Sequence, residues 1–82
     1  MGEQPLTSRQ LAILRALASG DATKAADIGD VIYIHDGSDP GSAWRHLDRL
    51  RKRGLVAHDH VWFLTRHGME TVLRAAAQEP GQ

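Results

Sequence analysis

The sequence predicts an α+β domain of three to four helices and one two-stranded β-hairpin. Apolar residues recur at helical spacing in the first, middle and last parts of the chain. Capping residues, glycines and a proline mark the ends of these stretches. Before the last helical stretch the pattern changes, because the segment LVAHDHVWFLT (55–65) is rich in residues that favour strands.

Length and composition allow one domain and exclude several classes of protein. The chain has 82 residues, so we expect a single domain (1–82) with an ordered core over about 6–78. The absence of cysteine excludes a disulfide framework and a thiolate metal site. No apolar stretch approaches the ~20 residues that cross a bilayer, and MGEQPLTSRQ lacks the pattern of a signal peptide. We therefore expect a cytoplasmic protein with no membrane partner.

The first predicted helix lies within LTSRQLAILRALASG (6–20). Thr7 is the expected N-cap, and Gln10, three residues later, completes a capping box. Gly20 is placed to end the helix in a left-handed conformation. One side of this helix carries the apolar residues Leu11, Ile13, Leu14, Leu17 and Ala18.

The next segment, ATKAADIGDVIYIHDGSDPGS (22–42), is ambiguous. A helix that begins near Lys24 points Asp27 and Asp30 outward and gathers on one face Ala25, Ile28, Val31 and Ile32. VIYI (31–34) could instead form a short strand, and Gly29 weakens the helix unless another backbone packs close to it. We favour the helix, then a loop at HDGSDPG (35–41), so that the connection, from about Tyr33 to Asp39, is longer than a tight turn.

The third predicted helix runs from Pro40 to Arg53. Asp39 suits its N-cap and Pro40 its first helical position, while Gly54 suits its end. The core stripe consists of Ala43, Leu47 and Leu50. At ~100° per residue, a polar set fans over the opposite side, made of Ser42, Arg45, His46, Arg49, Lys52 and Arg53.

A tight hairpin is predicted next, with strands at Leu55–Ala57 and Val61–Leu64 and a turn at His58, Asp59 and His60. It is the only expected sheet, apart from a short strand that the sequence allows before the second helix. Trp62 is expected to pack against the helices. Trp44 lies at the edge of the third helix's core stripe, so it either packs beside the hairpin or is exposed for contact with DNA or protein.

Thr65 suits the N-cap of a last helix, from Arg66 to about Gln78. Its apolar stripe consists of Met69, Val72, Leu73 and Ala76. The stripe either packs on the first helix or pairs with a second copy of the chain, for which residues 75–77 offer a small-residue surface. We expect a homodimer through helix 66–78 on DNA and allow a monomer when the protein is free.

Charge is unevenly distributed, although ten basic and ten acidic residues cancel. Residues 20–40 carry five Asp and one Lys, whereas residues 45–53 carry five Lys or Arg and one Asp. Taken alone, the basic run is better explained as a solvated helix end, where cations offset the helix dipole. Its position before a hairpin favours instead a helix that faces a polyanion.

The segment DPGSAWRHLDRLRKRGLV, followed by VWFLTRHG, resembles the winged helix-turn-helix domain of MarR-like transcriptional regulators. In that family a recognition helix with an R-x-L-x-x-L-x-x-x-G-L-V pattern enters a two-stranded wing, and an L-T-x-x-G element follows. The matching residues here are Arg45, Leu47, Leu50, Gly54-Leu55-Val56 and Leu64-Thr65-Arg66-His67-Gly68. The likeness covers about residues 6–75 and implies a small winged helix-turn-helix fold and a transcriptional regulator that binds double-stranded DNA.

The helix from Pro40 to Arg53 has the properties of a helix that reads the major groove. Its first turn offers Gly41, Ser42 and Arg45 toward the bases, and Arg45 can fork to a guanine edge. The resemblance implies DNA contacts chiefly at Ser42, Trp44, Arg45 and Arg49. The predicted DNA-binding set is Gly41, Ser42, Trp44, Arg45, His46, Arg49, Lys52, Arg53 and His60, in which His60 acts only weakly or when protonated.

Enzymatic and metal-binding roles are not expected. No Ser, His and Asp set and no phosphate-binding glycine loop has a suitable context. Five histidines without a cysteine or a helical i, i+4 histidine pair do not indicate zinc, and we expect no cofactor. The alternative function is a winged-helix module that binds protein through its acidic patch, Trp44 and last helix. Salt-dependent binding to duplex DNA would distinguish the two functions.

Overall fold

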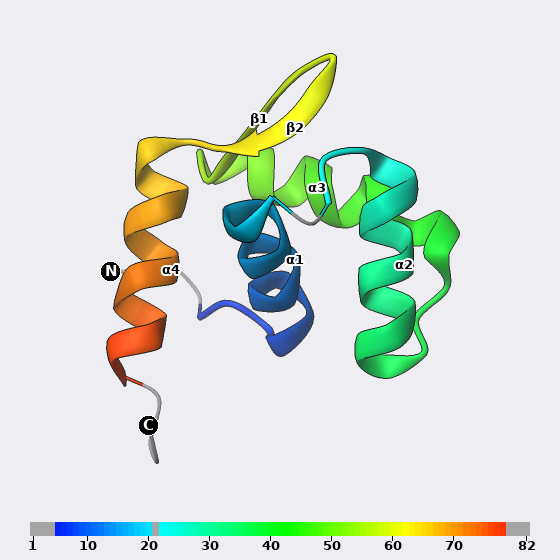
Figure 1. The fold of residues 1–82 in the computed structure, drawn as a ribbon, viewed down its shortest axis with the longest axis horizontal. Helices are drawn as coiled ribbons and strands as arrows, with labels where there is room; N and C mark the ends of the chain where they lie inside the picture. The colour runs from blue at the N-terminus through cyan, green and yellow to red at the C-terminus, as the bar shows by residue number, and fades with distance from the viewer. Residues whose placement is uncertain (1–4, 21, 79–82) are drawn as a thin grey trace.

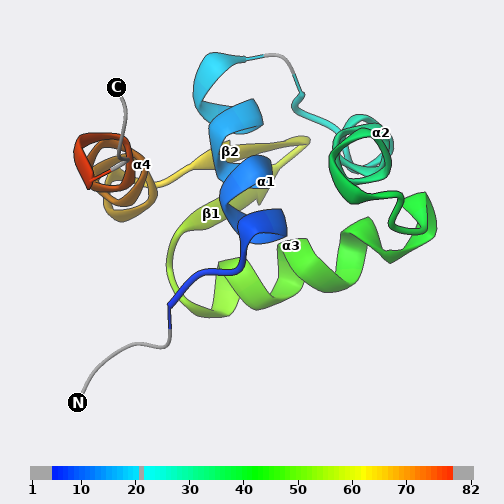
Figure 2. The same ribbon diagram turned by 90° about the horizontal axis from the view of Figure 1, so that it is seen from below.

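Helix α1 lies at the centre of the domain, with α2 and α4 on opposite sides of it and the hairpin against it (Figure 1). The computed structural model describes residues 5–20 and 22–78. Within these ranges the elements are α1 (Ser8–Ser19), α2 (Ala25–Asp36), the 3-10 turn η1 (Pro40–Ser42), α3 (Ala43–Lys52), β1 (Val56–Asp59), β2 (Val61–Leu64) and α4 (Arg66–Gln78). Helix α3 spans from α2 to the hairpin (Figure 2). The predicted α+β class, with four helices and an antiparallel hairpin, is confirmed for the described residues.

One hydrophobic core joins α1, α2, α3 and the hairpin. Its buried members are Ile13, Leu14, Leu17, Ala22, Ile28, Ile32, Ala43, Leu47, Leu50, Leu55, Val56 and Trp62. Burying each large aliphatic side chain contributes about 1.5–3 kcal/mol, so these residues supply most of the apolar burial that favours folding. Helix α4 adds only the half-buried Val72 at the edge of the core. None of the helices in the described part of the chain has the length and apolar character of a membrane span.

Helix α1 begins and ends as predicted. The Oγ1 of Thr7 accepts from the N–H of Gln10, and the Oε1 of Gln10 accepts from the N–H of Thr7, both at 3.1 Å. Gly20 closes the helix with a φ of +80°. The buried stripe is narrower than predicted, since Leu11 and Ala18 are only half-buried.

Helix α2 is confirmed, and the strand alternative for residues 31–34 is wrong. The predicted long connection is also wrong, because α2 continues through His35 and Asp36 and only residues 37–39 separate it from η1. Two interactions stabilise this extra turn. The N–H of Gly37, at a φ of +76°, donates to the carbonyl of Tyr33 at 2.8 Å, so this glycine caps the helix. The Nε of Arg9 on α1 contacts the carboxylate of Asp36 at 2.9 Å.

The predicted single helix from Pro40 to Arg53 is divided in two. Residues 40–42 form η1, and α3 begins at Ala43. The carboxylate of Asp39 accepts from the N–H of Gly41 at 3.1 Å, and the carbonyl of Asp39 accepts from the N–H of Ser42 at 2.9 Å. These short-range bonds favour the tighter 3-10 turn over an α-helical first turn. The predicted core stripe of α3 is confirmed, and Gly54 follows the helix at a φ of +77°.

Gly29 is the point where α2 lies against η1. A Cβ atom at this residue would lie 2.8 Å from the carbonyl oxygen of Pro40 and 3.1 Å from its Cβ. Real Cβ atoms essentially never approach backbone this closely. The close packing that would justify a glycine inside this helix is therefore present, and it sets how α2 meets the start of α3.

The hairpin is longer and its turn tighter than predicted. Val56 pairs with Leu64 and Asp59 pairs with Val61, so His58 and Asp59 belong to β1 and not to the turn. His60 alone connects the strands, with a φ of +70°. No further strand forms within the described residues, but the N–H of Trp62 donates to the carbonyl of Thr23 at 2.7 Å. This bond anchors the segment before α2 to β2.

The orientation of α4 differs from the prediction. Thr65 caps the helix as expected, since its Oγ1 accepts from the N–H of Gly68 at 3.0 Å. Of the predicted stripe only Val72 is half-buried; the exposed members are Met69, Leu73 and Ala76. The reason lies at Gly68, where a Cβ would lie 2.0 Å from the carbonyl oxygen of Leu55. The helix turns its glycine toward that backbone, and most of the apolar stripe is thereby rotated outward.

Replacing Gly29 by alanine tests the contact between α2 and η1. We expect Gly29→Ala to lower the free energy of unfolding by about 1–3 kcal/mol, the usual cost of overpacking. The reduction should appear although alanine favours helix over glycine by about 1 kcal/mol. Chemical denaturation provides the measurement. In the control Gly41→Ala, the new Cβ would meet nothing closer than the Asp39 side chain at 3.5 Å, and stability should change little. A Gly29→Ala variant as stable as the parent would contradict the close approach.

Candidate functional site

The outer face of α3 carries several exposed basic side chains. Ala43, Leu47 and Leu50 are buried in the core. At ~100° per residue, Arg45 and Lys52 lie opposite this stripe, and Arg49 lies between them and the side of α3 that faces α1. All three are exposed. The face is rigidly held, because the same helix supplies three core residues.

Asp48 offsets two of the cations on α3. Its carboxylate contacts the Nη2 of Arg51 at 2.8 Å and the Nζ of Lys52 at 3.2 Å. Hydrogen bonds from these two groups, that of Arg51 first, lower the pKa of Asp48. Within the described residues, neither Arg45 nor Arg49 forms an ion pair. Arg45 and Arg49 therefore present the least compensated positive charge on the helix.

The pKa of His46 is lowered at the junction of α3 and α1, partly by nearby positive charges. Its side chain is half-buried on the flank of α3. Burial is the largest cause that lowers the pKa of His46, followed by the positive charges of Arg9, Arg49 and Arg45; Asp36 acts in the opposite direction. Three guanidinium groups from two helices thus act on one imidazole, which remains neutral more readily than a free histidine.

Trp44 packs beside the hairpin and is also exposed. Its ring meets Trp62 edge-on, with centroids 5.2 Å apart, and meets His58 edge-on at 5.9 Å. His58 stacks on Trp62 at 4.5 Å. Trp62 is buried, as predicted, whereas 56% of Trp44 is exposed. This three-ring cluster joins α3 to the hairpin and leaves one indole available to a partner.

The remaining predicted contact residues lie at the two ends of this surface. Gly41 and Ser42 lie in η1, before α3 and not in its first turn. The hydroxyl of Ser42 donates to the carbonyl of Asp39 at 2.7 Å, so its proton is committed to the turn. His60 is almost fully exposed at the hairpin tip, with its Nε2 3.9 Å from the carboxylate of Asp59. Figure 1 shows this tip projecting beyond the helices.

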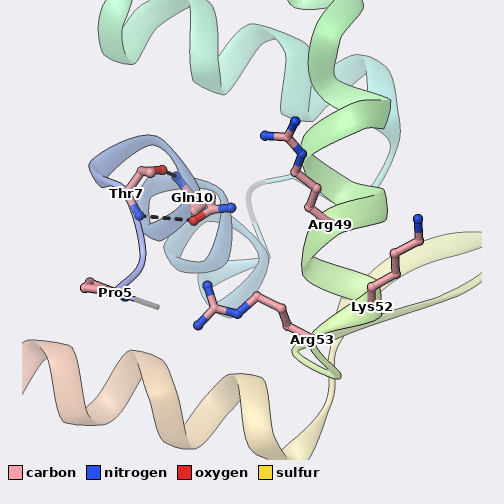
Figure 3. Close-up of a pocket in the computed structure, with 6 residues that line it drawn as sticks. All are labelled: Pro5, Thr7, Gln10, Arg49, Lys52 and Arg53. Atoms are coloured by element: carbon pink, nitrogen blue, oxygen red, sulfur yellow. Dashed lines mark hydrogen bonds between the residues drawn. The ribbon is translucent and has the colours of Figure 1, made fainter. Parts of the chain in front are cut away.

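A pocket that the sequence did not predict lies between the start of α1 and the end of α3. Its volume is ≈ 420 Å³, and it is lined by Pro5, Thr7, Gln10, Arg49, Lys52 and Arg53 (Figure 3). The capping box located the first turn of α1, and the charge run located the end of α3. No sequence signal placed these two turns side by side, because they come together only through the core.

Comparisons with known proteins and structures identify no match to this chain. No protein-family model matches the chain, and no curated protein or solved structure matches it significantly. Within the described residues there is no group of three or more His, Cys, Asp or Glu side chains that could hold a metal ion. Evidence on the function therefore comes from the charge and shape of the surface itself.

The titration of His46 tests the electrostatics of this surface. NMR of the imidazole protons should give a pKa below the usual 6.5. In Arg49→Gln the pKa should rise, while burial keeps it below that value; Arg66→Gln, on α4, should leave it unchanged. Because the folded pKa is the lower one, the stability that depends on neutral His46 is complete above pH 6.5 and is lost as pH falls through the folded pKa. An identical pKa in the parent and Arg49→Gln would contradict the proposed coupling.

Proposed function

We propose that the protein is a sequence-specific double-stranded-DNA-binding protein, a small transcriptional regulator of winged helix-turn-helix type that uses α3 as its recognition helix. The observation that supports this most directly is the outer face of α3. It presents Arg45 and Arg49 without an ion-pair partner among the described residues, on a helix that is fixed by its buried stripe. An exposed cationic helix held in this way suits the major groove.

The elements around α3 also support the proposal. Residues 37–42, which include η1, connect α2 to α3, and in this proposal the two helices form the helix–turn–helix pair. The hairpin follows α3 directly, in the position of the wing in MarR-like regulators, to which the sequence has a resemblance. Trp44 joins the two elements through its contact with Trp62. Both elements that could flank the groove are therefore tied to the helix that would enter it.

The cations on α3 would have different roles in this function. Arg45 lies near the start of α3 and can bind a guanine edge through two hydrogen bonds. Arg49, one turn later, is placed for a backbone phosphate, which gives affinity without sequence preference. Lys52 and Arg51 share Asp48, so each must exchange a carboxylate for a phosphate and should contribute less than Arg49.

The outer side of α2 favours a second candidate function, binding to a protein. Ile34 is 82% exposed and Tyr33 59% exposed, which is unusual for adjacent apolar residues on a small domain. Asp27 and Asp30 lie on the same helix and form no ion pair within the described residues. A partner for this face would carry basic residues around an apolar contact. Binding to duplex DNA with no dependence on salt, or no binding at all, would favour this function.

The outward stripe of α4 supports a homodimer as the DNA-bound form. Met69 is 40% exposed and Leu73 63% exposed, and Ala76 continues the same side. Two copies related by a twofold axis could bury these stripes against each other and present two α3 helices to successive half-sites. The contact surface differs from the one expected from sequence, because Val72 faces the core and not the partner.

Charge removal from α3 tests the DNA proposal. We expect Arg49→Ala to weaken binding to a mixed-sequence duplex and to reduce the slope of log K against log salt by about 1. Arg45→Ala should cost about 1–3 kcal/mol on a preferred site selected from a randomised duplex pool, and should relax preference at one position. The double variant Arg66→Ala/Arg74→Ala removes two charges from α4 and should change neither quantity. Parental binding by Arg45→Ala/Arg49→Ala at every salt concentration would refute the recognition-helix assignment.

Light scattering tests the homodimer. With limiting protein and a two-site duplex, the parent complex should have the mass of the duplex plus two chains. Leu73→Asp should shift it toward the duplex plus one chain, because the substitution would bury a carboxylate in the interface. Leu73 is exposed in the single chain, so the variant should keep the parental melting temperature. In contrast, Val72→Asp should lower that temperature. A Leu73→Asp variant that still pairs on DNA would exclude α4 as the interface.

A further inference from the structure

The pocket between α1 and α3 has an uneven distribution of polar groups. Figure 3 shows that the guanidinium groups of Arg49 and Arg53 both extend from α3 toward the first turn of α1, whereas Lys52 points away. Among the residues that the structure describes, no acidic side chain lines the pocket and Arg49 forms no ion pair. Arg53 follows Arg49 by one helical turn, so the two guanidinium groups reach the same opening.

The capping box adds a directed hydrogen-bond donor to this pocket. The Oε1 of Gln10 accepts from the N–H of Thr7 at 3.1 Å. Because the oxygen of the carboxamide is fixed there, its NH₂ group must point the other way, and Figure 3 shows it on the side of Arg49 and Arg53. The first turn of α1 also carries the positive end of the helix dipole. The carboxamide of Gln10 and the guanidinium groups of Arg49 and Arg53 therefore present donors and positive charge to the opening.

We propose that this pocket binds a phosphate group, which Arg49 and Arg53 hold between them while the carboxamide of Gln10 donates to it, and that in the complex with duplex DNA this is a backbone phosphate. Arginine suits such a role because its planar fork matches two phosphate oxygens. Burial is the main cause of the lowered pKa of His46, and the positive charges of Arg9 and Arg49 at this junction lower it further. The assignment of the phosphate to DNA rests on the proposed function.

The chain offers a matched set of variants for this site. Arg49→Gln/Arg53→Gln removes both clamps. Arg66→Gln/Arg74→Gln removes the same charge from α4, outside the pocket. Gln10→Glu keeps the capping box, since glutamate serves at this position as well as glutamine, but it places a negative charge at the opening. Helix α1 should therefore remain folded in Gln10→Glu while anion binding is lost.

NMR with inorganic phosphate at constant ionic strength tests the site itself. The backbone amides of residues 7–10, the carboxamide of Gln10 and the Nε–H groups of Arg49 and Arg53 should show saturable shifts. Saturation should be lost in Arg49→Gln/Arg53→Gln and in Gln10→Glu, and kept in Arg66→Gln/Arg74→Gln. The melting temperature of each variant verifies that it is folded. Shifts that never saturate, or that saturate equally in Gln10→Glu, would overturn the proposal.

Repeating the NMR experiment with duplex DNA in place of inorganic phosphate shows whether the pocket binds a DNA backbone phosphate or a phosphate from another source. The duplex should shift the same resonances, and Arg49→Gln/Arg53→Gln should reduce the salt slope by about 1 for the one clamped phosphate. If phosphate saturates the pocket but the duplex leaves its resonances unmoved, the assignment to DNA is overturned and a small phosphorylated molecule is the ligand. If Arg45→Ala alone weakens duplex binding and the pocket variants do not, the pocket proposal fails while the DNA-binding function stands.

Discussion

The close backbone contact between Gly29 of α2 and Pro40 of η1 is the constraint on which the candidate surface depends. A side chain at position 29 would push the two segments apart, since even a Cβ would lie 2.8 Å from the carbonyl oxygen of Pro40. The contact brings α2 against the start of α3, where Asp39 and Ser42 tighten the entry into a 3-10 turn. With its start fixed there and its buried stripe in the core, α3 has one orientation. Its cationic face must then point to solvent.

The electrostatics of the domain arise from local pairing and not from net charge. The chain is neutral overall, yet Asp36 pairs with Arg9 and Asp48 pairs with two cations of α3. Exposed ion pairs of this kind contribute about 0–1 kcal/mol each, so their larger effect is on the field around the helix. They suppress some cations and leave others uncompensated, which concentrates positive potential at Arg45, Arg49 and the junction with α1. Burial is the largest cause of the lowered pKa of His46, and this positive charge lowers it further.

Helix α4 shows how one backbone contact can decide which side chains are exposed. Gly68 lies against the carbonyl of Leu55, and this packing turns Leu73 and Met69 toward solvent. Rotating the helix to bury that stripe would move a side chain into the position that only glycine can occupy. In the proposed homodimer, a second copy of the chain covers this exposed apolar face.

Local chemistry within a few residues was sufficient to predict much of this protein. The capping box of Thr7 and Gln10, the buried stripe of α3 and the existence of the hairpin all follow from spacing and residue type, because their hydrogen bonds and periodicities are contained in short segments. The last turn of α2, the rotation of α4 and the pocket between α1 and α3 do not. They depend on an ion pair from Arg9 to Asp36, on the approach of Gly68 to Leu55, and on two helix ends that meet across the core. Each joins residues that are distant in sequence, so only packing of the whole chain could bring them together.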